Sequence, residues 1–242
     1  MQIIDRNYSG GQLDFEAGVV VVIDKPLGWT SSDVVRKIKF RLQKLGSRRV
    51  KVGHAGTLDP LATGVLLVCL GRATKRVEEL QAQEKEYLAD FVLGATTPSF
   101  DLEHPIDATY PHEHITLEAI ERALGELSGE RLQEPPVYSA KMVDGKRAYE
   151  YAREGSEVKM RHALVNIYSM TIEEYDHPRV RVCIRCSKGT YIRSIARELG
   201  EQLGSGAYLA ALCRTASGAY RAAAALTVDE ALAALSQQPE QK

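Results

Sequence analysis

The sequence predicts an α+β fold with a mixed, largely antiparallel central sheet flanked by helices. Strand-like and helix-like segments mix along the chain without a strict βαβ rhythm, which argues against an all-parallel sheet. Residues 165–175 and 179–186 both alternate between apolar and polar side chains, as neighbouring antiparallel strands with one wet face do. The chain has 242 residues and shows no internal repeat and no low-complexity linker. We therefore expect a single domain over residues 1–242.

Local patterns place the elements along the chain. The β-branched run Gly18–Asp24 is typical of a buried strand. The helix that follows can take its cap oxygen from any of four residues, Thr30, Ser31, Ser32 and Asp33. The expected elements, in order, are a strand at 18–24, a turn at 25–29, a helix at 34–45, a loop at 51–63, a strand at 65–70, a short helix from residue 74, a strand at 86–93, a helix at 116–127, an excursion at 134–157, strands at 165–175 and 179–186, a helix at 190–203, a strand at 207–212, and a helix at 228–235 with a polar tail from 236.

Composition narrows the class of protein. The chain is 44% hydrophobic and 26% charged, with a mean hydropathy of −0.23, as in ordinary globular proteins. No run of apolar residues is long enough for a membrane span, and residues 1–14 lack the apolar core of a signal peptide. We therefore expect a cytoplasmic protein with no membrane partner and with its four cysteines as thiols.

Positive charge is concentrated in one stretch, although the net charge is only −1. Between residues 34 and 58 the sequence has no Asp or Glu and eight basic residues, namely Arg36, Lys37, Lys39, Arg41, Lys44, Arg48, Arg49 and Lys51. Such a patch can neutralise phosphates and steer a polyanion toward the protein. A solvated helix face explains the same pattern equally well.

Two motifs that resemble metal sites are set aside. Cys183 and Cys186 have the spacing of a zinc or redox pair, but they lie on an alternating strand, where residues three apart face opposite sides. His112 and His114 lie beside a proline in a loop without a further ligand nearby. No P-loop, GxGxxG, HExxH or GxSxG motif occurs. ATP, NAD and zinc chemistry therefore lack their usual sequence support.

The strongest candidate for chemistry is Asp59, in the glycine-rich segment Gly53–Gly64. Glycines permit sharp turns and close approach of a ligand, and Pro60 restricts Asp59 to extended conformations. A carboxylate fixed in this way beside a basic stretch can act as a nucleophile or a base. Alternatively, Asp59 only caps a turn.

Two further residues are candidates on weaker grounds. Arg193 follows a glycine turn and begins a helix, where its planar guanidinium can pair with a carboxylate, but a surface arginine is equally consistent with this position. Tyr87 is near the start of a strand, where its ring can line a cleft or simply pack in the core.

Taken together, these stretches resemble the TruB family of tRNA pseudouridine synthases over residues 18–217. The resemblance rests on blocks in a fixed order, which are Asp24–Ser31, Gly53–Gly64, Gly71–Lys75, Lys85–Tyr87, Pro136–Lys141, Cys186–Arg193 and Leu209–Thr215. It implies the pseudouridine synthase fold and isomerisation of the T-loop uridine 55 of tRNA to pseudouridine, without metal or cofactor. The implied partner is the T loop and stem of tRNA, bound by a monomer.

The resemblance also implies a role for each matching residue. Asp59 matches the catalytic aspartate, Tyr87 a tyrosine that packs on the target base and is a candidate for proton transfer, and Arg193 an arginine that pairs with the aspartate. The implied substrate-binding residues are His54, Lys75, Leu212, Lys25, Lys141 and Arg147. The segment 134–157, with Lys141, Lys146, Arg147 and Arg153, matches an insertion that closes on RNA.

Three alternatives stay open, and one departure from the family is expected. The alternatives are a synthase for another RNA site, a non-catalytic RNA-binding module that keeps the shape, and a metabolic enzyme whose basic helix is ordinary surface. Bacterial relatives often have a C-terminal RNA-binding extension, and only about 25 residues follow Gly218 here, too few for such a domain. We therefore expect the extension to be lacking.

Overall fold

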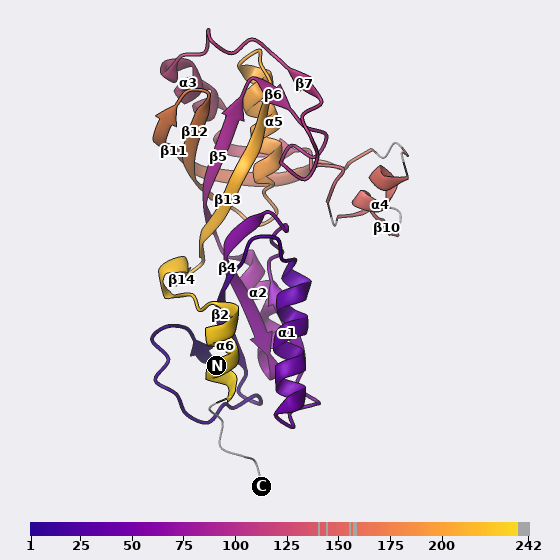
Figure 1. Ribbon diagram of the computed structural model, residues 1–242, viewed down its shortest axis with the longest axis vertical. Coiled ribbons are helices and arrows are strands. Elements are labelled where there is room, and N and C mark those ends of the chain that lie inside the picture. The colour runs from indigo at the N-terminus through magenta and orange to yellow at the C-terminus, as the bar shows by residue number, and fades with distance from the viewer. Residues whose placement is uncertain (140, 144, 155, 157–158, 237–242) are drawn as a thin grey trace. The chain divides into compact units, whose positions relative to one another are not determined.

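The computed structural model describes residues 1–139, 141–143, 145–154, 156 and 159–236. It divides into two compact units, each of which is described by itself. Unit 1 comprises Met1–Glu86 and Cys213–Lys242, and unit 2 comprises Tyr87–Leu212. Strands β5 (Lys85–Leu93) and β13 (Ala207–Ser217) each run from one unit into the other (Figure 1). That the chain works as a single catalytic domain stays a prediction.

The sheet of unit 1 explains the β-branched run near the N-terminus. Its strands are β1 (Gln2–Ile4), β2 (Val19–Lys25), β3 (Val52–Ala55), β4 (Ala62–Leu70), the end of β13, and β14 (Tyr220–Arg221). β1 is parallel to β2, whereas β2 and β3 are both antiparallel to β4. Alternate residues of β2 enter two different core clusters, Val19, Val21 and Ile23 on one face and Val20 and Val22 on the other. A strand buried on both faces requires such an unbroken apolar run.

Helices cover both faces of this sheet (Figure 1). Helix α1 (Ser31–Lys44) buries Val34 and Ile38 in one cluster together with α6 (Val228–Ser236). The 3₁₀ helix η1 (Gly71–Arg76) and α2 (Val77–Ala82) contribute to the other cluster. Helix α1 begins at a capping box, in which the side chains of Thr30 and Asp33 accept hydrogen bonds from each other's backbone. This cap fixes where α1 begins, directly after the turn that follows β2.

Unit 2 contains the second part of the sheet. Its strands follow the order β13, β5, β12 (Arg179–Cys186), β11 (Ala163–Asp176) and β8 (Gly129–Gln133), and β11 is antiparallel to both β12 and β8. Helices α3 (Leu117–Leu127) and α5 (Ile192–Gln202) pack against each other in this unit. The short strands β6 (Ala95–Thr96) and β7 (Ala108–Thr109) form a separate pair. The mixed, largely antiparallel sheet with flanking helices confirms the predicted α+β class.

The expected excursion at 134–157 contains a small sheet of its own. Strands β9 (Met142–Val143) and β10 (Lys146–Arg147) are antiparallel, and α4 (Ala148–Arg153) follows them (Figure 1). Residues 140, 144, 155 and 157–158 of this region, the side chain of Arg153, and the predicted tail from 237 lie outside the described residues. Among the residues that the structure describes, no helix is both long enough and apolar enough to cross a membrane.

The boundaries differ from expectation in a few places. The segment 51–63 is not wholly a loop, because Val52–Ala55 pairs with β4 as strand β3 despite Gly53. β1 and β8 were not predicted, since neither has an alternating pattern long enough to stand out from its surroundings. β13 continues to Ser217, five residues beyond the predicted end. The predicted bounds of 179–186 for β12 are confirmed.

Gly64, at the start of β4, gives a test of this packing. It has φ 95°, and a Cβ placed on it would lie 2.3 Å from the carbonyl oxygen of Arg214. We expect Gly64→Ala to lower the free energy of unfolding by about 3 kcal/mol, because backbone strain and a backbone clash add. Gly53→Ala, on the neighbouring strand, is the matched control, since nothing lies within 4 Å of its added Cβ. Equal thermal stability of the two variants would contradict this account.

Candidate active site

Asp59 lies in a short loop between β3 and β4 in unit 1. Its side chain is half-buried, and its carbonyl accepts a hydrogen bond from the amide of Ala62 at 3.1 Å. The residue before it is anchored twice by one hydroxyl, because Ser31 Oγ accepts from the Leu58 amide at 2.9 Å and donates to the Leu58 carbonyl at 3.1 Å. Ser31 is the first residue of α1, so the capped helix start and the loop are held together.

Arg214 fixes the loop from the other side. Its side chain is 1% exposed, and its guanidinium donates to three carbonyls, those of Val65 at 2.7 Å, Gly56 at 3.0 Å and Thr57 at 3.5 Å. A planar group with several fixed donors binds such a set of acceptors with little freedom. The backbone on both sides of Asp59 is therefore hydrogen-bonded to a single buried cation.

Lys25 is a second buried cation that binds the same loop. Its side chain is fully buried, and its ammonium donates to the carbonyls of Trp29 at 2.6 Å, Pro26 at 3.0 Å and Pro60 at 3.3 Å. Burial lowers the pKa of Lys25 from 10.5 to about 8, and the Asp59 carboxylate acts in the opposite direction. Lys25 is still mostly protonated at neutral pH. Its geometry is that of a residue that holds the loop, while its predicted contact with substrate stays a prediction.

His54 lies on β3, the strand that leads into the loop. Its ring is partly buried, and its Nδ1 has no hydrogen-bond partner among the described residues. Burial lowers the pKa of His54 below 6.5, and the positive charge of Arg214 lowers it further. The imidazole is therefore neutral at physiological pH, which suits contact with an uncharged ring better than contact with a phosphate.

Unit 2 contains the other predicted catalytic residues. Arg193 is 3% exposed, and its Nη1 donates to the carbonyls of Tyr138 at 2.9 Å and Ser99 at 3.4 Å, while its Nε is 3.7 Å from Asp101 Oδ2. Tyr87 is buried on β5. The predicted pairing of Arg193 with Asp59 stays a prediction, because the two residues belong to different units.

The predicted substrate-binding residues lie in varied surroundings. Lys75 is exposed on η1, and Leu212 is half-buried on β13. In the excursion, Lys141 donates to the Arg161 carbonyl at 2.7 Å, and Arg147 is exposed on β10. Within the described part of the chain, no group of three or more His, Cys, Asp or Glu side chains is arranged to hold a metal ion.

Comparison with protein-family models identifies the chain's relatives. The model of the TruB family pseudouridylate synthase N-terminal domain matches residues 42–192, more than half of the chain and a range that includes Asp59 and Tyr87. This chain belongs to the TruB family. The matched range includes the glycine-rich segment Gly53–Gly64, which Arg214, Ser31 and Lys25 hold in place.

Curated TruB-family relatives match most of the chain. The tRNA pseudouridine synthase B of Phocaeicola vulgatus is 53% identical over 218 residues, which cover 90% of this chain and 93% of that protein. The protein of the same name from Flavobacterium johnsoniae is 46% identical over 209 residues, covering 86% and 91%.

Solved structures confirm the pseudouridine synthase fold. A chain in "Crystal Structure of a Cbf5-Nop10-Gar1 Complex" has a TM-score of 0.69 and 27% identity, covering 95% of this chain and 62% of that one. A chain in "Structure of H/ACA RNP bound to a substrate RNA containing 2'-deoxyuridine" has a TM-score of 0.65 and 28% identity, covering 90% and 53%. This TruB-family chain therefore spans less than two thirds of the length of both.

Sequence reasoning missed two residues of this TruB-family site. Arg214 was noted only as part of a matching block, and Ser31 only as a possible cap. Arg214 lies two residues beyond the predicted end of the strand at 207–212, so no strand pattern indicated that its side chain is buried. Nothing in the sequence indicates the reciprocal bonds between Ser31 and Leu58, because 27 residues separate them.

Replacing Arg214 should change both the stability of the site and the titration of His54. We expect Arg214→Gln to raise the pKa of His54, because a nearby positive charge is removed. It should also lower the free energy of unfolding by about 3 kcal/mol, since buried carbonyls lose a charged donor. Arg214→Lys keeps the charge and is the matched control, with the pKa of His54 staying low. NMR titration of the histidine ring protons gives the pKa, and equal values in the two variants would contradict the electrostatic link.

Proposed function

We propose that this TruB-family chain converts uridine 55 in the T loop of tRNA to pseudouridine, with Asp59 as the essential carboxylate. The observation that carries the proposal is the 53% identity to a curated tRNA pseudouridine synthase B across 93% of that protein. The site supports it, because Asp59 lies half-buried on a loop that Arg214, Lys25 and Ser31 hold by hydrogen bonds. With tRNA as its partner, we expect the protein to act in the cytoplasm.

The reaction is an isomerisation that needs no added reactant. The bond from N1 of the uracil to C1′ of the ribose breaks, and a bond from C5 to C1′ forms. C5 loses its proton, and N1 ends with one, so the atoms balance without water or a cofactor. A base stacked in a helix cannot rotate in this way, and the nucleotide must leave the stack first. A loop is the favourable place for this step, since its bases are already partly unstacked.

Each proposed catalytic residue has a distinct task. Asp59 attacks the nucleoside or abstracts a proton to begin glycosidic bond cleavage, and a carboxylate can do either. Arg193 keeps the Asp59 carboxylate ionised and oriented toward the nucleoside. Tyr87 packs on the base and takes part in proton transfer. Leu212 lines the pocket that retains the detached uracil. The neutral ring of His54 stacks near the flipped nucleotide.

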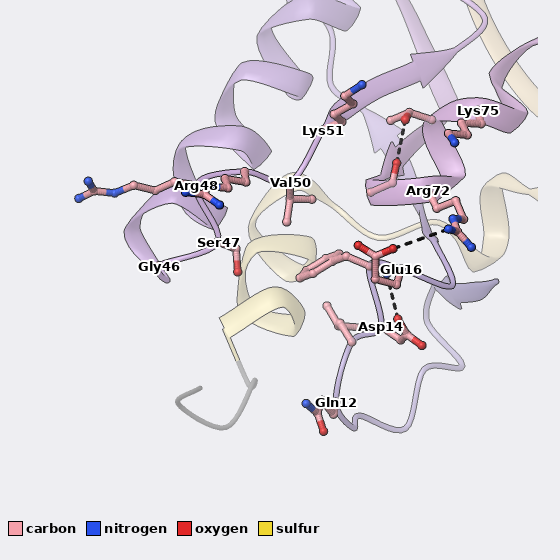
Figure 2. Close-up of a pocket in the computed structure, with 15 residues that line it drawn as sticks. Gln12, Asp14, Glu16, Gly46, Ser47, Arg48, Val50, Lys51, Arg72 and Lys75 are labelled. Atoms are coloured by element: carbon pink, nitrogen blue, oxygen red, sulfur yellow. Dashed lines mark hydrogen bonds and ion pairs between the residues drawn. The ribbon is translucent and has the colours of Figure 1, made fainter. Parts of the chain in front are cut away.

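Binding of the RNA backbone is supported by a basic trough in unit 1. We use this name for the cationic residues that line two adjoining cavities, of about 1020 and about 560 Å³, namely Lys39, Arg48, Arg49, Lys51, Arg72 and Lys75. The two cavities share the segment 48–51, and the smaller one reaches His54. Figure 2 shows Arg48, Lys51, Arg72 and Lys75 around the larger cavity.

The acidic residues of the larger cavity are already engaged. Glu16 pairs with Arg72 at 3.9 Å, and Asp14 accepts a hydrogen bond from the amide of Glu16 at 2.9 Å (Figure 2). Asp14 also accepts a hydrogen bond from the amide of Ala17 at 2.9 Å. The cations of the trough outnumber these two carboxylates, so the trough attracts phosphates even though the net charge of the chain is −1. In this proposal the excursion at 134–157, with Lys141 and Arg147, closes over the bound RNA.

Release of tritium from C5 tests the proposed activity. We expect the full-length protein to release tritium from an unmodified tRNA transcript that contains C5-tritiated uridine. Asp59→Asn should reduce the rate by about a thousand-fold or more, since it removes the carboxylate and keeps the size. Asp229→Asn, an exposed position on α6 of the same unit, should release tritium as the wild type does.

Mapping the modified position separates the alternatives. Pseudouridine in the T loop supports the proposal, and pseudouridine elsewhere indicates another RNA site. Binding of the transcript without any release indicates a non-catalytic RNA-binding module.

Salt dependence tests the basic trough. Replacing Lys39 and Arg49 together by Ala should make the negative slope of log affinity against log salt shallower by about 1.5, because each phosphate contact contributes roughly 0.7 to 0.9 to its magnitude. The matched control replaces Arg122 and Arg179, two exposed arginines of unit 2, and should leave the slope unchanged. Anisotropy of labelled tRNA over a salt series gives both slopes. Equal slopes for the Lys39 and Arg49 variant and the control would show that the trough does not bind the RNA backbone.

A further inference from the structure

A second concave surface of unit 1 has aromatic rather than purely basic walls. A groove of about 540 Å³ is lined by Gly28, Trp29, Asp33, Arg36, Lys37 and Phe40. Phe40 is on α1 and is 54% exposed, which is unusual for a phenylalanine. Trp29 packs partly against the core of unit 1 and also lines the groove, so its indole is held firmly.

The wall of this groove is tied to the loop that carries Asp59. The amide of Gly28 donates to the carbonyl of Pro60 at 2.8 Å, and the ammonium of Lys25 bridges the carbonyls of Trp29 and Pro60. Pro60 directly follows Asp59 in the chain. The groove wall at Gly28 and Trp29 is therefore held by the same hydrogen bonds that hold the loop of the proposed catalytic carboxylate.

The charges around the groove suit an anionic ligand with flat rings. Arg36 and Lys37 are exposed on the outer face of α1, and the ammonium of Lys44 lies 4.6 Å from the centre of the Phe40 ring. The acidic residue of the groove, Asp33, accepts bonds from Thr30 and is paired with Arg36 at 3.0 Å. Aromatic side chains interleaved with cations are the usual elements of a surface that binds unpaired nucleotides.

We propose that this groove is a subsite for an unpaired base of the RNA substrate, stacked against Phe40 and Trp29, with the adjoining phosphate bound by Arg36 and Lys37. That the ligand is RNA rests on the proposed function. The subsite is separate from the basic trough, since the two share no lining residue. It binds a base outside the site of isomerisation, so it contributes affinity and register while Asp59 acts on the target uridine.

Tryptophan fluorescence gives a direct test, because Trp29 is the only tryptophan of the chain. The Asp59→Asn protein is titrated with an unmodified tRNA transcript, and Trp29 emission is followed beside the anisotropy of labelled tRNA. Stacking of a base should quench the emission with the same midpoint as binding. A perfectly paired RNA duplex of equal length, which can bind only through its backbone, should bind without quenching.

Substitution of Phe40 adds a second readout. Base–aromatic stacking predicts that Phe40→Ala weakens tRNA binding on the order of tenfold and that Phe40→Tyr restores it. Tyr168→Ala is the matched control, since Tyr168 is a 49% exposed aromatic residue on β11 of unit 2 and should bind tRNA as the wild type does. Thermal unfolding of each variant checks that the fold is intact.

Two results would overturn the subsite. If saturating tRNA leaves Trp29 emission and the affinity of Phe40→Ala unchanged, the groove is available to an apolar side chain of a protein partner instead. If the duplex quenches as strongly as tRNA, the signal follows phosphates rather than bases. Failure of the proposed function is distinct from both. Pseudouridine formation by the wild type without quenching would contradict only the subsite. Quenching without any pseudouridine formation would support the subsite and contradict the proposed function.

Discussion

The buried guanidinium of Arg214 is the constraint on which the loop that carries Asp59 depends. It donates to carbonyls on both sides of Asp59, at Gly56, Thr57 and Val65. A loop has no ladder of backbone hydrogen bonds to hold its shape. In a mobile loop, the half-buried carboxylate of Asp59 would have no fixed orientation. A single rigid donor group removes that freedom. If Asp59 acts as proposed, its loop needs little reorganisation during the reaction.

Other residues hold the same loop in addition to Arg214. Ser31 ties the loop to the capped start of α1, and Lys25 ties it to the turn that precedes that helix. Gly64 lets the backbone of Arg214 come into direct contact with β4, where any side chain would intrude. The site is thus built from backbone carbonyls and a few buried donors. The cationic side chains of the basic trough, which are proposed to bind RNA, are exposed, so their substitution costs the fold little.

Much of this fold could be predicted from the sequence, and the failures have physical reasons. The β-branched run at β2 and the alternation of β12 are local signals, and both strands were predicted to within one residue. The cap of α1 was predicted only as one of four residues, and α1 begins three residues before the predicted start. β3 was taken for a loop because Gly53 lowers strand propensity, whereas its pairing with β4 decides the outcome. The glycines and the proline around Asp59 were enough to propose it as a candidate, and its role stays a prediction. The bonds of Arg214 to residues about 150 positions away could not be predicted, because long-range contacts leave no periodic trace.

The two buried lysines have a consequence for chemical modification. Lys85 resembles Lys25 in donating to three backbone carbonyls, those of Leu80, Gln81 and Gln83, and both side chains are almost wholly enclosed. Reagents and enzymes that acylate lysine need a free amine with an accessible lone pair, and neither residue presents one while the chain is folded. Acetyl groups found at these two positions in cells would therefore mark molecules that were modified before folding or after damage, not a regulated pool of native protein.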